Sequence, residues 1–262
     1  MQGKGTKPPD FDVCLFRHHP LYVSILKSLN PACLCDMRKY LLFLLVLLMP
    51  VINHAGSGKP VPAPEEQCDL YSTLNLSALG LTKEVFQIAL KGYRKLEAIG
   101  KLQNAAIITI IDFSQSSKKK RCYVIDLMNK VLLFNTYVAH GRNTGGEYAD
   151  HFSNKAGSCQ SSLGFYVTGE EIKGSSVGLS VLLEGMEKGF NDNALKREII
   201  MHGADYATEN FIRKTGRLGR SFGCPSLPPD LIRPVAETIK EGTCLFIYHK
   251  DDSYISNSTL LK

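Results

Sequence analysis

Apolar residues recur with a helical spacing in one segment of the chain. Between residues 82 and 99 they form one apolar face, made of Val85, Phe86, Ala89, Leu90, Tyr93 and Leu96. Thr82 can cap the start of such a helix and Gly100 can end it. The pattern therefore predicts a helix over 82–99, inside an N-terminal helical segment that we place at 67–104.

The pattern then changes to short runs rich in β-branched and aromatic residues. Three such runs cover 105–113, 122–128 and 131–140, and turn-forming residues separate them at 114–120 and 129–130. Runs of this length and composition, bounded by turn signals, are typical of strands. We expect a three-stranded meander.

The second half of the chain contains further short apolar runs of the same kind. Further strands are predicted at 163–169, 178–186, 197–203 and 243–249, and a helix is possible at 231–240. Residues 141–162 are rich in Gly, Ser and Asn and predict a long loop, which in a compact domain is often functional. Together these elements predict a mostly β domain with helical additions over 105–250, followed by a C-terminal tail at 251–262.

A short basic and apolar stretch precedes this domain. Met37-Arg38-Lys39 is followed by an apolar run that ends at Met49, and Ala55 offers a cleavage point. The run is shorter than the ~20 residues that span a bilayer. Residues 37–55 are therefore typical of a cleaved secretory signal. We expect export to the periplasm or cell envelope, with no stable membrane span after cleavage.

Two segments flank this signal. We interpret residues 1–36 as a mis-called upstream extension, because Met37 has the context of a start codon before a signal peptide. Residues 56–66 contain the sequence GSGKPVPAP, which predicts a flexible linker.

Composition and charge fit a globular protein that does not bind nucleic acid. Hydrophobic residues make up 44% and charged residues 21% of the chain. Residues 1–55 hold six Lys or Arg and three acids, so removing them lowers the formal net charge from +6 to +3. The basic run at 118–121 lies between two predicted strands, and we expect it to be a solvated hairpin loop.

The cysteines indicate unpaired thiols. Of eight, five lie beyond the signal: Cys68, Cys122, Cys159, Cys224 and Cys244. An odd number leaves at least one thiol free or bonded to another molecule. Cys122 and Cys244 fall in strand-like runs where buried thiols are common, and the disulfide state of Cys68 and Cys159 stays open. No pair has C-x-x-C spacing, so no metal site is expected.

One histidine and one cysteine stand out as a candidate nucleophile and base. His202-Gly203 ends an apolar run, and Ser221-Phe222-Gly223-Cys224-Pro225 follows later in the chain. A thiol becomes a nucleophile when a base such as histidine removes its proton. Gly223 lets the backbone turn sharply, which would expose the thiol and direct N–H groups at a developing oxyanion.

Several blocks around these residues occur in a recognisable order. They are IIDFSQSSKKKRCYVIDL, VAHGRNTG, HFSNKAGSCQSSLGFYVTGE, GLSVLLEGMEKGFNDNALKREIIMHGADY and GRLGRSFGCPSLP. The chain thereby resembles the murein L,D-transpeptidase catalytic domain (YkuD-like) family, in its branch with Pro after Cys. The resemblance spans about 109–248 and implies a β-sandwich or mixed-sheet domain.

The resemblance also implies a cysteine enzyme that needs no cofactor and acts on peptidoglycan stem peptides. Cys224 would be the acylated nucleophile and His202 the general base, its imidazole oriented by a backbone carbonyl. Gly203 and Ser221 would shape the site, and the N–H groups of Gly223 and Cys224 would form the oxyanion hole. An amine acceptor would give a 3–3 cross-link.

The chain departs from many relatives at two positions, and this leaves the substrate carboxylate without an assigned partner. Phe222 stands where many have His, and Ser226 where many have Arg or Asn. Guanidinium groups match carboxylates, so the first candidates are Arg220, Arg217 and Arg213. Weaker candidates for lining the cleft are His140, Gly141, Ser161, Ser162 and Tyr166.

Other functions stay open at this point. Water as acceptor would make the protein an L,D-carboxypeptidase or endopeptidase. A sortase would use Arg233 after the cysteine, but the upstream blocks do not resemble one, and a papain-like protease places Cys before His. A non-catalytic envelope-binding module would carry an inert Cys224. We expect a monomer.

Overall fold

The computed structural model describes residues 70–174 and 177–262. The predicted upstream extension (1–36), signal (37–55) and linker (56–66) lie outside these residues, as does Cys68. No helix in the described ranges is long and apolar enough to cross a membrane.

The strands of the described residues form one mixed sheet, which confirms the mostly β, mixed-sheet prediction. Its order is β3-β2-β1-β8-β4-β5-β6-β7. The β1–β8 and β6–β7 pairs are parallel and the other pairs are antiparallel. The strands are β1 (Ile107–Asp112), β2 (Cys122–Asp126), β3 (Val131–Thr136), β4 (Gly164–Gly174), β5 (Gly178–Gly185), β6 (Ile200–Gly203), β7 (Ser226–Leu227) and β8 (Cys244–Tyr248).

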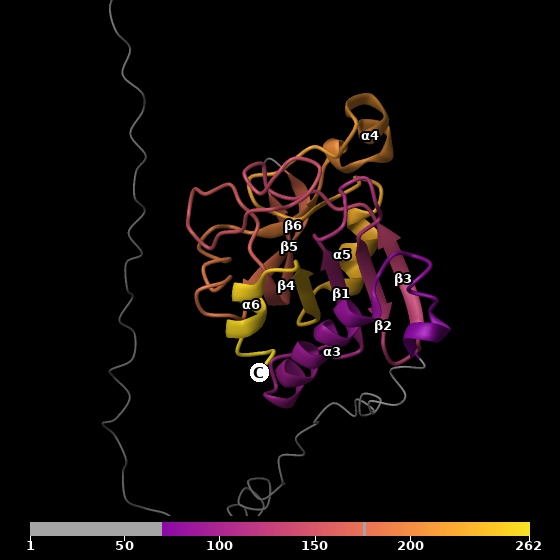
Figure 1. Ribbon diagram of the computed structural model, residues 1–262, viewed down its shortest axis with the longest axis vertical. Coiled ribbons are helices and arrows are strands. Elements are labelled where there is room, and N and C mark those ends of the chain that lie inside the picture. The colour runs from indigo at the N-terminus through magenta and orange to yellow at the C-terminus, as the bar shows by residue number, and fades with distance from the viewer. Residues whose placement is uncertain (1–69, 175–176) are drawn as a thin grey trace, which may run out of the picture. The chain divides into compact units, whose positions relative to one another are not determined.

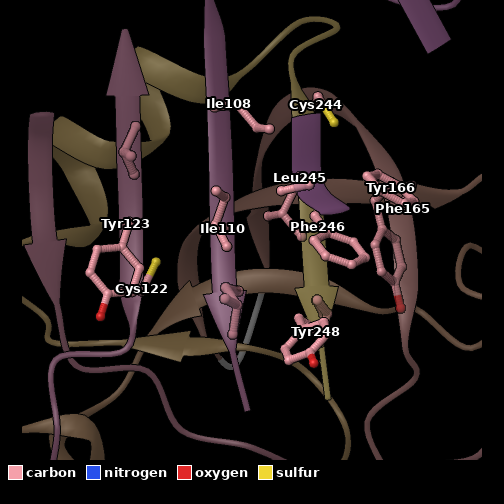
Figure 2. Close-up of a cluster of buried hydrophobic side chains, with 14 of the residues drawn as sticks. Ile108, Ile110, Cys122, Tyr123, Phe165, Tyr166, Cys244, Leu245, Phe246 and Tyr248 are labelled. Carbon is pink, nitrogen blue, oxygen red and sulfur yellow. The ribbon is translucent and has the colours of Figure 1, made fainter. Parts of the chain in front are cut away.

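The centre of the sheet is apolar on both faces. β1 and β8 are buried along their whole length. Their sequences are therefore mostly apolar and do not alternate between apolar and polar residues. Figure 2 shows their side chains beside those of β2 and β4. The rings of Phe165 and Phe246 stack with centroids 4.1 Å apart, a contact that adds about 1 kcal/mol to the burial itself.

Two helices cover the two faces of this centre. The predicted first helix is α3 (Lys83–Ala98), capped by the Thr82 side chain as expected, and its Gly92 packs on the Phe165 ring. The predicted helix after the cysteine is α5 (Ile232–Ile239). It lies behind the sheet in Figure 1, and its Ile239 carbonyl accepts from the Thr168 hydroxyl, which points to the face opposite Phe165.

The meander β1-β2-β3 is present as predicted, but β3 is shorter than the predicted run. It ends at Thr136, not at 140. Beyond it the chain pairs with another partner, because Ala139 and Ser226 exchange backbone hydrogen bonds of 2.9 and 3.2 Å. The end of the apolar run thus contacts the cysteine loop, which we define as residues 221–226.

The solvated-loop prediction for 118–121 is wrong for its last residue. Residues 118–120 are exposed, whereas Arg121 is fully buried. Its guanidinium donates to the Val138 carbonyl at 3.0 Å and bonds His140 Nδ1 at 2.8 Å. Burial lowers the pKa of Arg121 to about 9. Backbone carbonyls and an aromatic neighbour replace the water that a charge pattern alone would suggest.

The C-terminal segment is packed, which corrects its description as a tail. It contains α6 (Asp252–Asn257), whose Tyr254 is fully buried. The Tyr254 hydroxyl donates to Glu187 Oε2 at 2.8 Å, and the Phe165 N–H donates to the same oxygen at 2.8 Å. Burial raises the pKa of Glu187. A buried carboxyl therefore joins the end of the chain to the sheet.

Besides α6, three short elements were not predicted, and these three lie between His202 and Leu227. They are η1 (Asp205–Ala207), α4 (Glu209–Thr215) and the two-residue β7. α4 has no buried side chain, and Figure 1 shows it standing away from the sheet. α4 has no buried face, and η1 and β7 have only three and two residues, so none of them carries an apolar period that the sequence pattern could reveal.

Candidate active site

The β6–β7 edge of the sheet carries the two residues singled out as nucleophile and base. β6 ends on His202-Gly203, and its parallel pairing with β7 sets His202 opposite Ser226. Cys224 lies two residues before Ser226. The sheet register therefore places the cysteine loop directly beside the histidine strand, although the two are distant in sequence.

The His202 ring is held at both nitrogens. Nδ1 lies 3.0 Å from the Gly203 carbonyl and Nε2 lies 3.0 Å from Ser226 Oγ. Because a carbonyl only accepts, we assign the proton to Nδ1, and Nε2 accepts from the Ser226 hydroxyl. Burial lowers the pKa of His202, so the ring is neutral at neutral pH. A neutral ring with its lone pair at Nε2 has the form that a general base requires.

Ser226 connects His202 to a residue that the sequence did not single out. Its hydroxyl lies 3.1 Å from the Tyr206 hydroxyl, and either group can donate. When His202 is neutral, Ser226 donates to Nε2. When the ring is protonated, Ser226 can accept from Nε2 and donate to Tyr206. The sequence block that ends in HGADY contained Tyr206, but only the fold shows that it reaches β7.

Ser221 forms hydrogen bonds within the cysteine loop. Its Oγ accepts from the Gly223 N–H at 3.0 Å and donates to the Cys224 carbonyl at 2.6 Å. Its backbone bonds both neighbours of Gly141, because its N–H donates to the His140 carbonyl and its carbonyl accepts from the Arg142 N–H. The loop is thus fixed on one side by residues 140–142.

The hydrogen bonds of Ser221 occupy one of the two N–H groups that were expected to form the oxyanion hole. The Gly223 N–H donates to Ser221 Oγ at 3.0 Å. The Cys224 N–H donates to no other residue in the described ranges, so it is the donor that stays available. Gly223 has φ 134°, and a Cβ there would lie 2.9 Å from the Gln160 carbonyl. A glycine is required here by conformation and by close approach.

A guanidinium that the sequence did not single out lies behind the loop. Arg197 Nη2 is 3.4 Å from the place where a Cβ of Gly223 would stand. Its N–H groups donate to the Ser153 carbonyl at 2.7 Å, to the Gln160 carbonyl at 2.6 Å and to Ser162 Oγ. Arg197 has no carboxylate partner among the described salt bridges. Arg197 therefore links the long loop to the cysteine loop near Gly223.

Cys224 and His202 rest as a neutral pair. Burial raises the pKa of the Cys224 thiol, and the Ile200 N–H and the Arg197 charge oppose that rise. The thiol makes one weak contact, 3.8 Å from its sulfur to the Glu198 carbonyl. In the part of the chain that is described, no hydrogen bond joins Cys224 Sγ to His202, whose Nε2 is bonded to Ser226 instead. The raised pKa of Cys224 and the lowered pKa of His202 both favour the neutral thiol and the neutral ring over a standing ion pair.

Two of the weaker site candidates are buried and cannot line a cleft. His140 is 1% exposed, and burial, with the Arg121 charge, lowers its pKa to about 3. A Cβ on Gly141 would lie 2.6 Å from the Cys159 carbonyl and 3.0 Å from Gly223 Cα. Both residues shape the site from behind. Gly203 also permits a close approach, because a Cβ there would lie 2.9 Å from Ile232 of α5.

The serine and tyrosine candidates are also structural. Ser161 is fully buried, accepting from the Gly141 N–H and donating to the Gly223 carbonyl, each at 3.0 Å. Ser162 donates to the Ser153 carbonyl at 2.8 Å, and buried Tyr166 donates to the Ser162 carbonyl at 2.9 Å. The hydroxyl groups of Ser161, Ser162 and Tyr166 are thus engaged in hydrogen bonds within the protein.

Each of the three candidate arginines contacts an acceptor group within the protein. Arg213 lies 3.0 Å from the Glu209 carboxylate, and Arg217 donates to the Leu218 carbonyl at 2.6 Å. Arg220 is exposed, but its Nη1 donates to the carbonyls of Arg142 and Gly145 at 3.0 and 2.9 Å. Each therefore already has an internal partner.

The cysteines of the described residues are all free thiols. Cys122 and Cys244 are fully buried, which confirms that prediction, and Cys159 and Cys224 are partly exposed free thiols. No cluster of three or more His, Cys, Asp or Glu side chains in the described part could hold a metal ion.

Comparison with known proteins identifies a family model and a set of similar solved structures. A model of the L,D-transpeptidase catalytic domain matches residues 77–248. Similar solved structures include the helical cell shape determining protein Pgp2 of Campylobacter jejuni, 14% identical, covering 63% of this chain and 57% of that one, with a TM-score of 0.38. L,D-transpeptidase 3 from Mycobacterium tuberculosis is 13% identical, covering 55% and 61%, with a TM-score of 0.35.

An L,D-transpeptidase from Mycobacterium smegmatis is 11% identical, covering 55% of this chain and 59% of that one, with a TM-score of 0.34. The chain thus spans about 60% of the length of these solved chains. No curated protein matches.

Proposed function

Because the chain belongs to the L,D-transpeptidase catalytic domain family, which covers residues 77–248, we propose that it transfers acyl groups between peptidoglycan stem peptides through a Cys224 acyl-enzyme. The observation that carries the proposal is the pairing of β6 with β7. It sets a neutral histidine, oriented by the Gly203 carbonyl, beside the loop of the cysteine.

The first half of the reaction forms a thioester. The Ser226 hydroxyl turns toward Tyr206 and frees His202 Nε2, which takes the thiol proton of Cys224. The sulfur attacks the carbonyl of the L-centre of a diamino acid in the donor stem, and the Cys224 N–H stabilises the oxyanion. The C–N bond to D-Ala then breaks, and the leaving amine takes the proton from His202.

The second half returns the enzyme to its starting state. The amine of an acceptor stem attacks the thioester and gives its proton to His202. The C–S bond breaks, and the released sulfur recovers that proton from the ring. The product is a 3–3 cross-link. If water attacks instead, the same site works as an L,D-carboxypeptidase or endopeptidase.

We also propose that the reaction takes place after export, in the periplasm or cell envelope. This rests on the signal-like sequence at 37–55. The peptidoglycan substrate follows from the family.

The decisive experiment incubates the protein with a disaccharide-tetrapeptide and follows the products by mass spectrometry. We expect a cross-linked dimer and released D-Ala with the parent protein, and neither product with Cys224→Ala. Cys159→Ala is the matched control, because Cys159 is the other partly exposed free thiol of the described residues, and it should retain full activity.

The outcomes separate the candidate functions. Release of D-Ala without a dimer would make the protein a carboxypeptidase. If no product forms and the peptide that contains Cys224 also resists alkylation at neutral pH, the protein is a non-catalytic binding module and the proposal is wrong.

A further inference from the structure

An aromatic ring next to the nucleophile stands out into solvent. Phe222 is 70% exposed, more than any other large hydrophobic side chain of the described residues. Its neighbours Ser221 and Gly223 are buried, and their hydrogen bonds to residues 140–142 and to Ser161 fix the backbone. The ring is therefore held outward by a rigid loop, two residues from Cys224.

An arginine lies over this ring. The Arg142 guanidinium carbon is 4.5 Å from the centroid of Phe222. The backbone of Arg142 is fixed at both ends, because its N–H donates to Ser221 at 2.7 Å and its carbonyl accepts from Arg220 at 3.0 Å. The ring and the guanidinium thus form one platform beside the cysteine loop, which we call the Arg142–Phe222 platform.

The hydrogen-bonding edge of Arg142 is open. Its side chain is exposed, and it takes part in none of the salt bridges of the described ranges. A guanidinium that rests on a ring face keeps its N–H groups in the plane, where they can bind a carboxylate in a bidentate manner. Arg213, Arg217 and Arg220 all have internal partners, so Arg142 is the better-placed cation.

We propose that the Arg142–Phe222 platform binds a free carboxylate of the donor stem peptide, either on the side chain of the diamino acid or at the terminal D-Ala. Arg142 pairs with the carboxylate, while Phe222 orients the guanidinium and covers the adjoining apolar part of the peptide. This rests on the proposed function for the identity of the peptide. It gives the substrate carboxylate a partner in a chain that has Ser226 where many relatives have Arg or Asn.

A binding measurement tests the platform without requiring turnover. In the full-length Cys224→Ala protein, the Kd of the disaccharide-tetrapeptide is measured by calorimetry, with and without Arg142→Gln. We expect Arg142→Gln to raise the Kd about tenfold or more, Arg142→Lys to raise it less, and Phe222→Leu to raise it about threefold. Lys119→Gln, an exposed cation on the 118–120 loop, is the control and should change nothing.

Amidated peptides identify the carboxylate and exclude a merely structural effect. One peptide carries an amide on the side-chain carboxyl of the diamino acid, and another on the terminal D-Ala carboxyl. The effect of Arg142→Gln should disappear for the peptide whose bound carboxylate has been removed and persist for the other.

Three results would overturn the proposal. The first is an unchanged Kd in Arg142→Gln, and the second is no measurable binding of the peptide at all. The third is an equal loss of affinity for the acid and both amidated peptides, which would make Arg142 a structural residue. All three differ from failure of the proposed function, which would show as absent turnover in the parent protein while the Kd still depended on Arg142.

Discussion

In the centre of the sheet, β1 and β8 are buried along their whole length and present mainly apolar side chains. At the edge, β6 and β7 have four and two residues, and the loops around them are fixed by Ser161, Ser221 and Arg197. The centre is stabilised by burial of apolar area, which is not directional. The edge is positioned by hydrogen bonds, which are directional.

This difference has a consequence for substitutions. Loss of apolar volume in the centre should lower the free energy of unfolding and leave the chemistry of folded molecules intact. Loss of a polar group at the edge should change the chemistry more than the stability, because the edge strands contribute little buried apolar area.

The largest expected effect comes from His202→Gln at the edge. The variant keeps a polar side chain of similar size but removes the base, so kcat for cross-linking should fall about 10²–10⁴-fold. The free energy of unfolding, measured by urea denaturation, should change by no more than about 1 kcal/mol. His151→Gln, at an exposed position, is the control. A loss of stability that accounts for the whole loss of activity would mean that His202 is structural.

In the centre of the sheet, Phe246→Ala should lower the stability of the protein and leave its catalytic rate unchanged. Phe246 is fully buried and stacks on Phe165, so its truncation should cost about 3–5 kcal/mol of unfolding free energy. We expect kcat per folded molecule to stay close to that of the parent protein at low temperature. Ile99→Ala, at a position 63% exposed, should change stability by less than about 0.5 kcal/mol. The comparison fails if kcat falls while Phe246→Ala remains fully folded.

The same contrast explains what the sequence could predict. The helix 82–99 and the runs that became β1, β2 and β8 were predictable because burial leaves a period in the pattern of apolar residues. His202 and Cys224 were found because thiol chemistry needs a base and because family blocks surround them. Their roles remain predictions.

Partners at the edge were not predictable, because contacts between distant segments leave no local pattern. Arg197 lies in a polar stretch that resembles an ordinary surface turn, and Tyr206 precedes an exposed helix. Arg121 illustrates the converse. It ends a run of four basic residues, and only the fold shows that it turns inward to His140. Charge patterns do not distinguish a solvated cation from a buried one with carbonyl partners.

A smaller effect is expected when Arg197 loses its charge. Arg197→Gln should slow alkylation of Cys224 by iodoacetamide at neutral pH on the order of tenfold, since the nearby charge that favours the thiolate is removed. Arg197→Lys keeps the charge and should preserve the pH profile of alkylation, although it loses part of the contacts to Ser153 and Gln160. Lys196→Gln is the adjacent exposed control. If both Arg197 variants shift the profile equally, the residue acts through structure and not through its charge.

The last prediction concerns His140, which lies between the two regions. Its ring contacts Phe113 of the core in a T-shaped arrangement, and its carbonyl accepts from Ser221 of the cysteine loop. Burial and the Arg121 charge lower its pKa from the ordinary 6.5 to about 3. Between these two pH values the unfolded chain binds a proton that the folded protein does not. Stability should therefore rise with pH across this window, by up to about 1.4 kcal/mol per unit from this one residue.

His140→Gln isolates that contribution, because the amide oxygen can still accept from Arg121 but does not titrate. Urea denaturation at a series of pH values between 3 and 6.5 should give a profile flatter by one proton than that of the parent protein. His151→Gln should leave the slope unchanged, since that side chain is exposed. A slope that His140→Gln does not alter would show that His140 is protonated in the folded protein. The polar edge would then tolerate a charge that the apolar centre, a few residues away, could not.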